Sequence, residues 1–66
     1  MQNRTNVQTE AHPTLANWTI TIWQDLWGVW AYEAVGPTRK WQGNGFRRAK
    51  QARERAFEAI SMEKGA

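Results

Sequence analysis

Residues 18–23 alternate between two sets of side chains, as expected of a β-strand whose side chains point to opposite faces in turn. The set formed by Trp18, Ile20 and Ile22 is predicted to face the core, because two of its members are aliphatic and β-branched. Trp23 belongs to the other set, together with two threonines, so we expect it to lie at least partly on the outside.

An aromatic-rich stretch at residues 27–33 is predicted to be central to the sheet. As a strand it places Trp30 and Tyr32 on one face and Glu33 on the other. Aromatic residues at this density favour a pleated, half-buried surface. We expect the strand to run from about 28 to 35, after a turn at 24–28 in which Gly28 supplies a positive φ.

A third, short strand is predicted at residues 39–42. The turn before it lies at 36–38, where Pro37 fixes φ and gives no donor, and residues 43–45 (Gly-Asn-Gly) end it. From about 47 to 63 the apolar spacing becomes helical, with a stripe of alanines and Ile60 along one face. A helix lined with small residues can lie close to a sheet face that carries large ones.

These elements predict an α+β domain over residues 16–64, in which a three-stranded antiparallel sheet packs on one C-terminal helix (βββα). Residues 1–15 are polar, without periodicity and interrupted by Pro13, so we expect a flexible, disordered tail. One helix covers only one face of a sheet. The other face is therefore predicted to be open to solvent or to a partner, and it carries Thr19, Thr21, Trp23, Val29, Ala31 and Glu33.

Composition narrows the classes of function. The chain has 66 residues, no cysteine and one histidine, which excludes disulfides and the usual Cys/His zinc clusters. It shows no Ser-His-Asp set, no credible pair of catalytic carboxylates and no glycine-rich phosphate loop, so we expect neither an enzyme nor a cofactor. Because no apolar run reaches the length of a membrane span and no signal peptide is evident, a cytoplasmic protein is expected.

The net charge of +3 is concentrated in the last third of the chain. Charges cancel over residues 1–23 and 24–46, so the whole surplus lies in 47–66. Arg47, Arg48 and Lys50 stand where the first turn of a helix favours acids, each mismatch costing about 0.3–1 kcal/mol. An anion such as phosphate would reverse the sign of this effect. The alternative is that these long side chains are simply solvated and screened.

Residues 27–33 (Trp-Gly-Val-Trp-Ala-Tyr-Glu), with Trp41 and the Gly45-Phe46 pair before an alanine-rich helix, resemble the ethylene-response-factor class of plant DNA-binding domains, an AP2-like fold. Similar arrangements occur in the arm-binding domains of phage integrases and in small phage proteins. The resemblance covers about residues 18–62. It implies a sheet face laid in the DNA major groove, with Trp27 and Glu33 on the DNA side, joined by Lys40 and Trp41. Where the family carries strand arginines, this chain has Ile20, Trp23, Asp25 and Val35.

Two functions follow as predictions. The first is a small nucleic-acid-binding domain, with DNA as the favoured ligand, that uses the open sheet face and the basic helix N-terminus. Its predicted site residues are Trp23, Trp27, Glu33, Arg39, Lys40, Trp41, Arg47, Arg48 and Lys50. The alternative is a protein-interaction module, such as a phage-encoded inhibitor that docks on a host protein complex through the exposed sheet face. Self-association as a homodimer through that face is a variant, and neither function involves a metal or a membrane.

Overall fold

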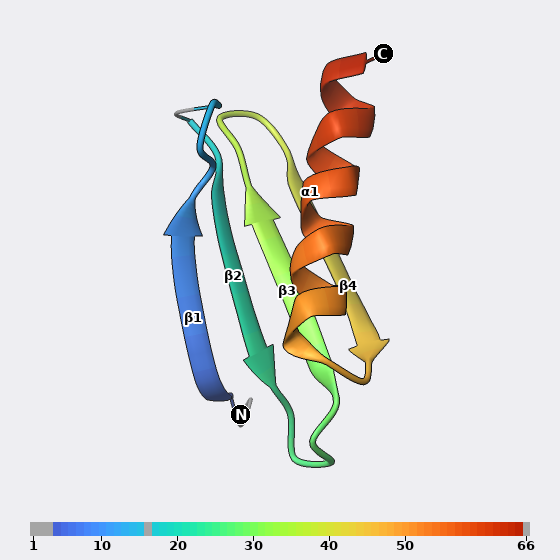
Figure 1. The fold of residues 1–66 in the computed structure, drawn as a ribbon. Helices are drawn as coiled ribbons and strands as arrows, with labels where there is room; N and C mark the ends of the chain where they lie inside the picture. Colours follow the sequence, from blue (N-terminus) through green and yellow to red (C-terminus); the bar gives the residue numbers. More distant parts are fainter. Residues whose placement is uncertain (1–3, 16, 66) are drawn as a thin grey trace.

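The protein folds into one antiparallel sheet with a single helix across one face. A computed structural model describes residues 4–15 and 17–65. The elements are β1 (Thr5–Ala11), β2 (Thr19–Gln24), β3 (Trp30–Val35), β4 (Lys40–Phe46) and α1 (Ala49–Gly65). The strands lie side by side in sequence order (Figure 1). The predicted α+β class is confirmed.

The prediction of three strands and a disordered tail is wrong, because residues 5–11 form β1 and the order of elements is ββββα. Residues 1–3 of the predicted tail lie outside the described residues. Every residue of β1 is exposed, so no burial imposes the apolar alternation from which strands are predicted. Backbone pairing with β2 holds the strand, and polar side chains add to it: Asn6 Nδ2 donates to Gln24 Oε1 at 2.6 Å.

His12 makes several contacts in the connection between β1 and β2. The Nδ1 atom of His12 accepts hydrogen bonds from the backbone N–H groups of Thr14 and Leu15, at 3.1 and 3.0 Å. The backbone N–H of His12 donates to the Trp18 carbonyl at 2.9 Å, and its ring centroid lies 5.1 Å from that of Phe57 on the helix. His12 therefore anchors a tight turn.

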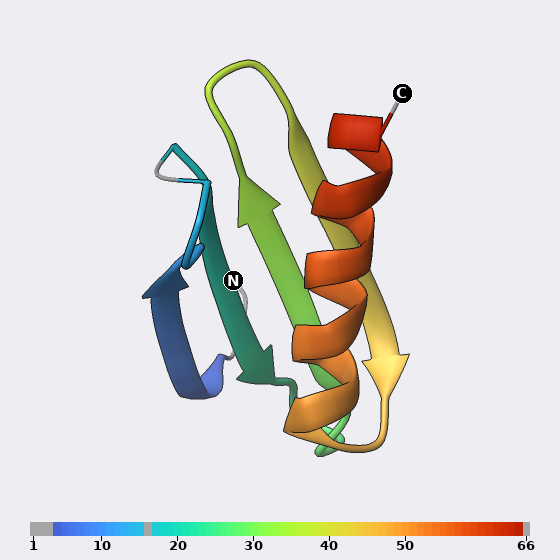
Figure 2. The same ribbon diagram turned by 45° about the horizontal axis from the view of Figure 1, so that its top comes forward.

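The core lies between the helix and the sheet face that it covers. Figure 2 shows α1 running along β3 and β4, whereas β1 lies at the sheet edge farther from the helix. The inward orientation predicted for Ile20, Ile22 and Tyr32 is confirmed, and these side chains pack against the alanine stripe of the helix. Because the helix contributes mainly alanines and Ile60, its backbone can approach the large side chains of the sheet closely.

The strand β4 is longer than predicted, because residues 43–45 continue it and do not end it. Gly43 pairs with Tyr32, and a Cβ added at residue 43 would lie 2.4 Å from Cε2 of the Tyr32 ring. The pairing register then shifts before Phe46, and Gly45 adopts a φ of 89° in this irregular segment. Glycine here serves packing and a bulge within a strand.

Candidate nucleic-acid interface

The turn between β2 and β3 presents two apolar side chains to solvent. Asp25 Oδ1 accepts hydrogen bonds from the backbone N–H groups of Trp27 at 2.8 Å and Val29 at 3.0 Å. Gly28 has the predicted positive φ, at 77°, and its carbonyl accepts a hydrogen bond from the Gln24 side chain at 3.0 Å. Within this hydrogen-bonded turn the side chains of Leu26 and Trp27 are 68% and 81% exposed.

Cations gather at the same end of the sheet as this turn. Trp30 pairs with Gln24 on one side and with Phe46 on the other, so residues 25–29 and the start of α1 lie beyond the same edge (Figure 1). The side chains of Arg47, Arg48 and Lys50 are exposed there, and within the described part of the chain they form no ion pair. We call this surface the basic end and define it as Leu26, Trp27, Arg47, Arg48 and Lys50.

The helix start adds to the positive potential of the basic end. The first turn of α1 contains no acidic residue. The Arg48 carbonyl accepts the first helical hydrogen bond, from Gln51 N at 3.1 Å, and Gln51 Oε1 accepts from Arg47 N at 3.2 Å. The side chain of Gln51 thus reaches back over the helix start. The partial positive charge of the helix terminus and the three side-chain charges have the same sign.

Trp23 lies on the face of the sheet that the helix leaves open, as predicted. The Cζ atom of Arg4 lies 3.8 Å from the centroid of its ring, a distance typical of a cation–π contact. Trp23 is half-buried, and Ala31, its pairing partner on β3, is only 5% exposed. The prediction that Ala31 is open to solvent is therefore wrong, because the large neighbours of this small residue cover it.

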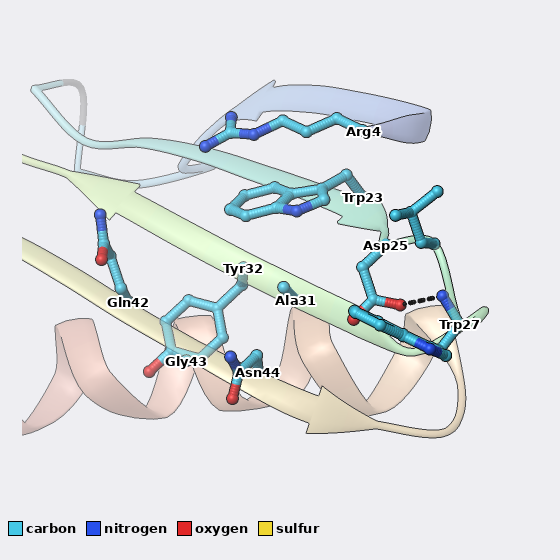
Figure 3. Close-up of a pocket in the computed structure, with 10 residues that line it drawn as sticks. Arg4, Trp23, Asp25, Trp27, Ala31, Tyr32, Gln42, Gly43 and Asn44 are labelled. Atoms are coloured by element: carbon cyan, nitrogen blue, oxygen red, sulfur yellow. Dashed lines mark hydrogen bonds between the residues drawn. The ribbon is translucent and has the colours of Figure 1, made fainter. Parts of the chain in front are cut away.

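A hollow of about 620 Å³ lies beside Trp23 and extends to the β2–β3 turn. Figure 3 shows Trp23 with Arg4 above it on one side of the hollow and Trp27 at its end. Gln42 and Asn44 line it from β4, and Ala31 lines it from β3. The hollow thus combines aromatic rings, amide groups and a guanidinium, and it shares Trp27 with the basic end.

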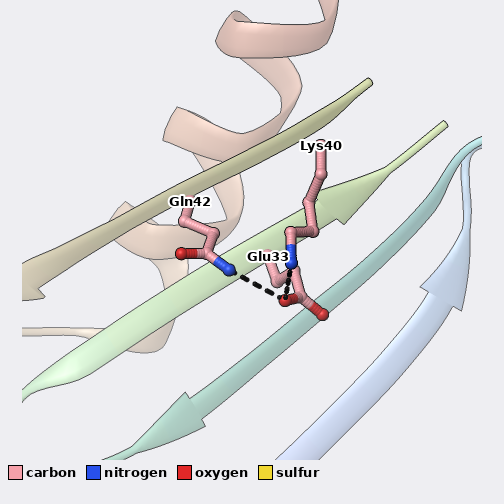
Figure 4. A network of polar contacts seen from close by, with 3 residues as sticks. All are labelled: Glu33, Lys40 and Gln42. Carbon is pink, nitrogen blue, oxygen red and sulfur yellow. Dashed lines mark hydrogen bonds and ion pairs between the residues drawn. The ribbon is translucent and has the colours of Figure 1, made fainter. Parts of the chain in front are cut away.

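Farther along the open face, Glu33 is engaged by two neighbours on β4. Its Oε2 atom accepts a hydrogen bond from Gln42 Nε2 at 3.1 Å and lies 3.7 Å from Lys40 Nζ (Figure 4). The Lys40 side chain is 55% exposed and that of Glu33 is 21% exposed. The carboxylate therefore offsets the charge of Lys40 and holds the amide of Gln42 in one orientation.

The remaining predicted site residues lie elsewhere. Arg39 is in the β3–β4 turn, at the opposite end of the sheet from Trp27. Trp41 pairs with Ala34 and packs against the core on the helix side, and its buried indole N–H finds no hydrogen-bond partner among the described residues. The structure thus places Trp27, Arg47, Arg48 and Lys50 at one end of the sheet, and Trp23 shares the hollow with Trp27.

The sequence-based prediction missed Arg4, Gln42 and Asn44. Arg4 directly precedes β1, whose β-branched residues Thr5, Val7 and Thr9 alternate with polar ones, and this alternation is the signal that indicates a strand there. No local pattern marks Gln42 and Asn44, because their position beside Trp23 depends on strand pairing.

Comparisons with protein-family models, with curated proteins and with solved structures found no match to this chain. Among the described side chains of residues 4–15 and 17–62, no three His, Cys, Asp or Glu residues are grouped so that they could hold a metal ion. In the same ranges no helix has the length and the apolar character needed to cross a membrane.

Proposed function

We propose that the protein is a small nucleic-acid-binding domain, with DNA as its ligand and the basic end as its contact surface. The observation that carries this proposal is a solvent-exposed Trp27 on a hydrogen-bonded turn, at the same end of the sheet as three cations that form no ion pair in the described residues. Cations that neutralise phosphates release condensed counterions, and this release drives binding without regard to sequence. An exposed indole face can stack on any base.

The resemblance of residues 27–33 to the ethylene-response-factor class supports DNA as the ligand, but the proposed contact differs from that of the class. The open face here carries Lys40 offset by Glu33 and a half-buried Trp23. Arg–guanine pairing across that face is therefore not part of the proposal. The absence of cysteine fits a protein that acts in the reducing cytoplasm.

A titration over a series of salt concentrations tests the proposal, with labelled duplex and single-stranded DNA and fluorescence anisotropy as the readout. We expect saturable binding at low salt whose affinity falls steeply as salt is added. The solution mass of the protein, measured in the same buffers, shows whether the binding species is a monomer. If neither DNA form binds at low salt, the proposal is wrong.

A second candidate function is docking on another protein, and the exposed pair Leu26 and Trp27 favours it. Large apolar side chains on a rigid turn are typical anchors of protein interfaces. The basic end thereby replaces the sheet face as the docking surface, since Ala31 is buried and Arg4 covers part of Trp23. The homodimer form of this function predicts a solution mass that rises with concentration in the natural protein and stays monomeric in Trp27→Ala.

A further inference from the structure

We infer that the hollow beside Trp23 receives one unpaired nucleobase, so that the domain prefers single strands and frayed strand ends to intact duplex. This inference rests on the proposed function and specifies its ligand. It starts from the hollow itself, which lies on the open face and is lined by Leu26 and Trp27 of the basic end.

The shape and lining of the hollow suit a flat aromatic ligand. Its volume of about 620 Å³ falls within the range of about 300–1,000 Å³ that is usual for small-molecule sites. The small side chain of Ala31 leaves room above β3, and Trp23 and Trp27 flank the resulting hollow (Figure 3). Bases released from a helix stack on such aromatic faces, and this stacking accounts for much of the affinity of single-strand binders.

The amide groups on β4 supply hydrogen-bonding partners for the edge of a base. Gln42 donates through Nε2 to Glu33, which leaves its Oε1 as an acceptor. Asn44 is exposed and offers both a donor and an acceptor. The edge of an unpaired base presents the complementary groups, whereas in a duplex that edge is already paired.

The charges around the hollow match the backbone that a bound base would bring with it. The Arg4 guanidinium lies against the Trp23 ring at the rim, 3.8 Å from the ring centroid. Trp27 lines the hollow and lies at the same end of the sheet as Arg47 and Arg48, so in this inference the strand continues from the bound base toward these cations. Another hollow, between β4 and α1, is less suitable because Glu54 and Glu58 line it beside Arg47 and Arg55.

Three ligands of equal length, about 12 nucleotides, test the inference within the site sizes usual for single-strand binders. They are an intact single strand, a single strand that lacks its bases and a duplex. At one salt concentration we expect the intact strand to bind about tenfold more tightly than the other two and to change the tryptophan fluorescence of the protein. If the intact and base-free strands bind equally, the hollow takes no base, although the proposed function survives. If none of the three binds, both proposals fail.

Two variants locate the base contact. Trp27→Ala, at a solvent-exposed position, is expected to lower affinity for the intact strand about tenfold while changing affinity for the base-free strand much less. Asn44→Ala removes the amide from the hollow without removing an aromatic ring, and a severalfold loss for the intact strand alone is expected. Val35→Ala, on the open face at the far end of β3, serves as the control with unchanged affinities. Equal losses for both strands in Trp27→Ala would contradict the inference.

Discussion

The side chain of Asp25 holds the backbone turn that carries the exposed side chain of Trp27. One carboxylate oxygen receives the backbone N–H groups of both Trp27 and Val29, so a single side chain closes the turn from β2 to β3. The backbone N–H of Asp25 also donates to the Val29 carbonyl at 2.9 Å. A turn closed in this way limits the directions available to Trp27 before any ligand binds, which lowers the entropic cost of binding.

Replacement of Asp25 tests this role of the turn. Asp25→Ala removes the acceptor for two backbone donors, and we expect the free energy of unfolding to fall by about 1–3 kcal/mol. Asp25→Asn keeps an oxygen in the same place and is expected to recover most of the loss. Urea denaturation followed by tryptophan fluorescence measures both variants. Equal stability of Asp25→Ala and the natural protein would show that the turn does not depend on this side chain.

The close approach of Gly43 to the Tyr32 ring leads to a second prediction about a single residue. Because a Cβ there would lie 2.4 Å from the Tyr32 ring, Gly43→Ala must displace a core side chain, at a cost of about 1–3 kcal/mol. Asn44→Ala is the control, since it changes an exposed residue of the same strand and is expected to cost no more than about 0.5 kcal/mol. Urea denaturation midpoints compare the two, and similar midpoints would argue against the close packing of Tyr32 on β4.

The tryptophans show which residue roles the sequence can predict. Alternation within one strand is enough to turn Trp30 inward and Trp23 outward, because it requires no knowledge of the neighbouring strand. The orientation of Trp41 depends on its pairing with Ala34, and the irregular stretch at Gly43–Gly45 obscures that register in the sequence. No local pattern in the sequence therefore argues against Trp41 as a nucleic-acid contact, and only the fold shows that it packs against the core.

At the scale of the element, β1 shows why an edge strand can escape sequence-based prediction. None of its residues is buried, and its side chains contact the rest of the protein mainly through polar groups, including an ion pair of Glu10 with Arg53 on the helix at 2.6 Å. Both partners are more than 40% exposed, so this ion pair contributes at most about 1 kcal/mol. The strand depends chiefly on its backbone pairing with β2.

Hydrogen exchange of the backbone amides distinguishes a strand from a tail at residues 5–11. Amides of β1 that bond to β2 are expected to exchange at least about tenfold more slowly than in an unfolded chain, yet faster than those of the central strand β3, because an edge opens at lower free-energy cost. Amides of β3 provide the internal reference. If all β1 amides exchanged at unfolded-chain rates, residues 5–11 would be a disordered tail, as the composition of residues 1–15 predicts.

At the scale of the whole molecule, the part predicted correctly is the part that buries apolar surface. β2, β3 and α1 each carry a periodic apolar face, so their types and approximate bounds follow from the sequence. The hollow beside Trp23 combines side chains from β2, β3, β4 and the turn with Arg4, and the pairing register alone places them together. The sequence predicts the cations of the basic end, but only the fold shows that they lie at the same end of the sheet as Trp27.

The distribution of charge over the molecule leads to a quantitative prediction for nucleic-acid binding. If Arg47, Arg48 and Lys50 each neutralise one phosphate of a single strand, the logarithm of the affinity should fall with the logarithm of salt concentration with a slope of about −2, at about 0.7 per contact. Arg48→Gln should make that slope shallower by about 0.7. Arg55→Gln removes the same charge from a residue outside the basic end, whose Nη1 atom lies 3.3 Å from Glu58 Oε2. This substitution should leave the slope unchanged. Equal effects of the two substitutions would mean that net charge attracts the strand, with no defined contact at the basic end.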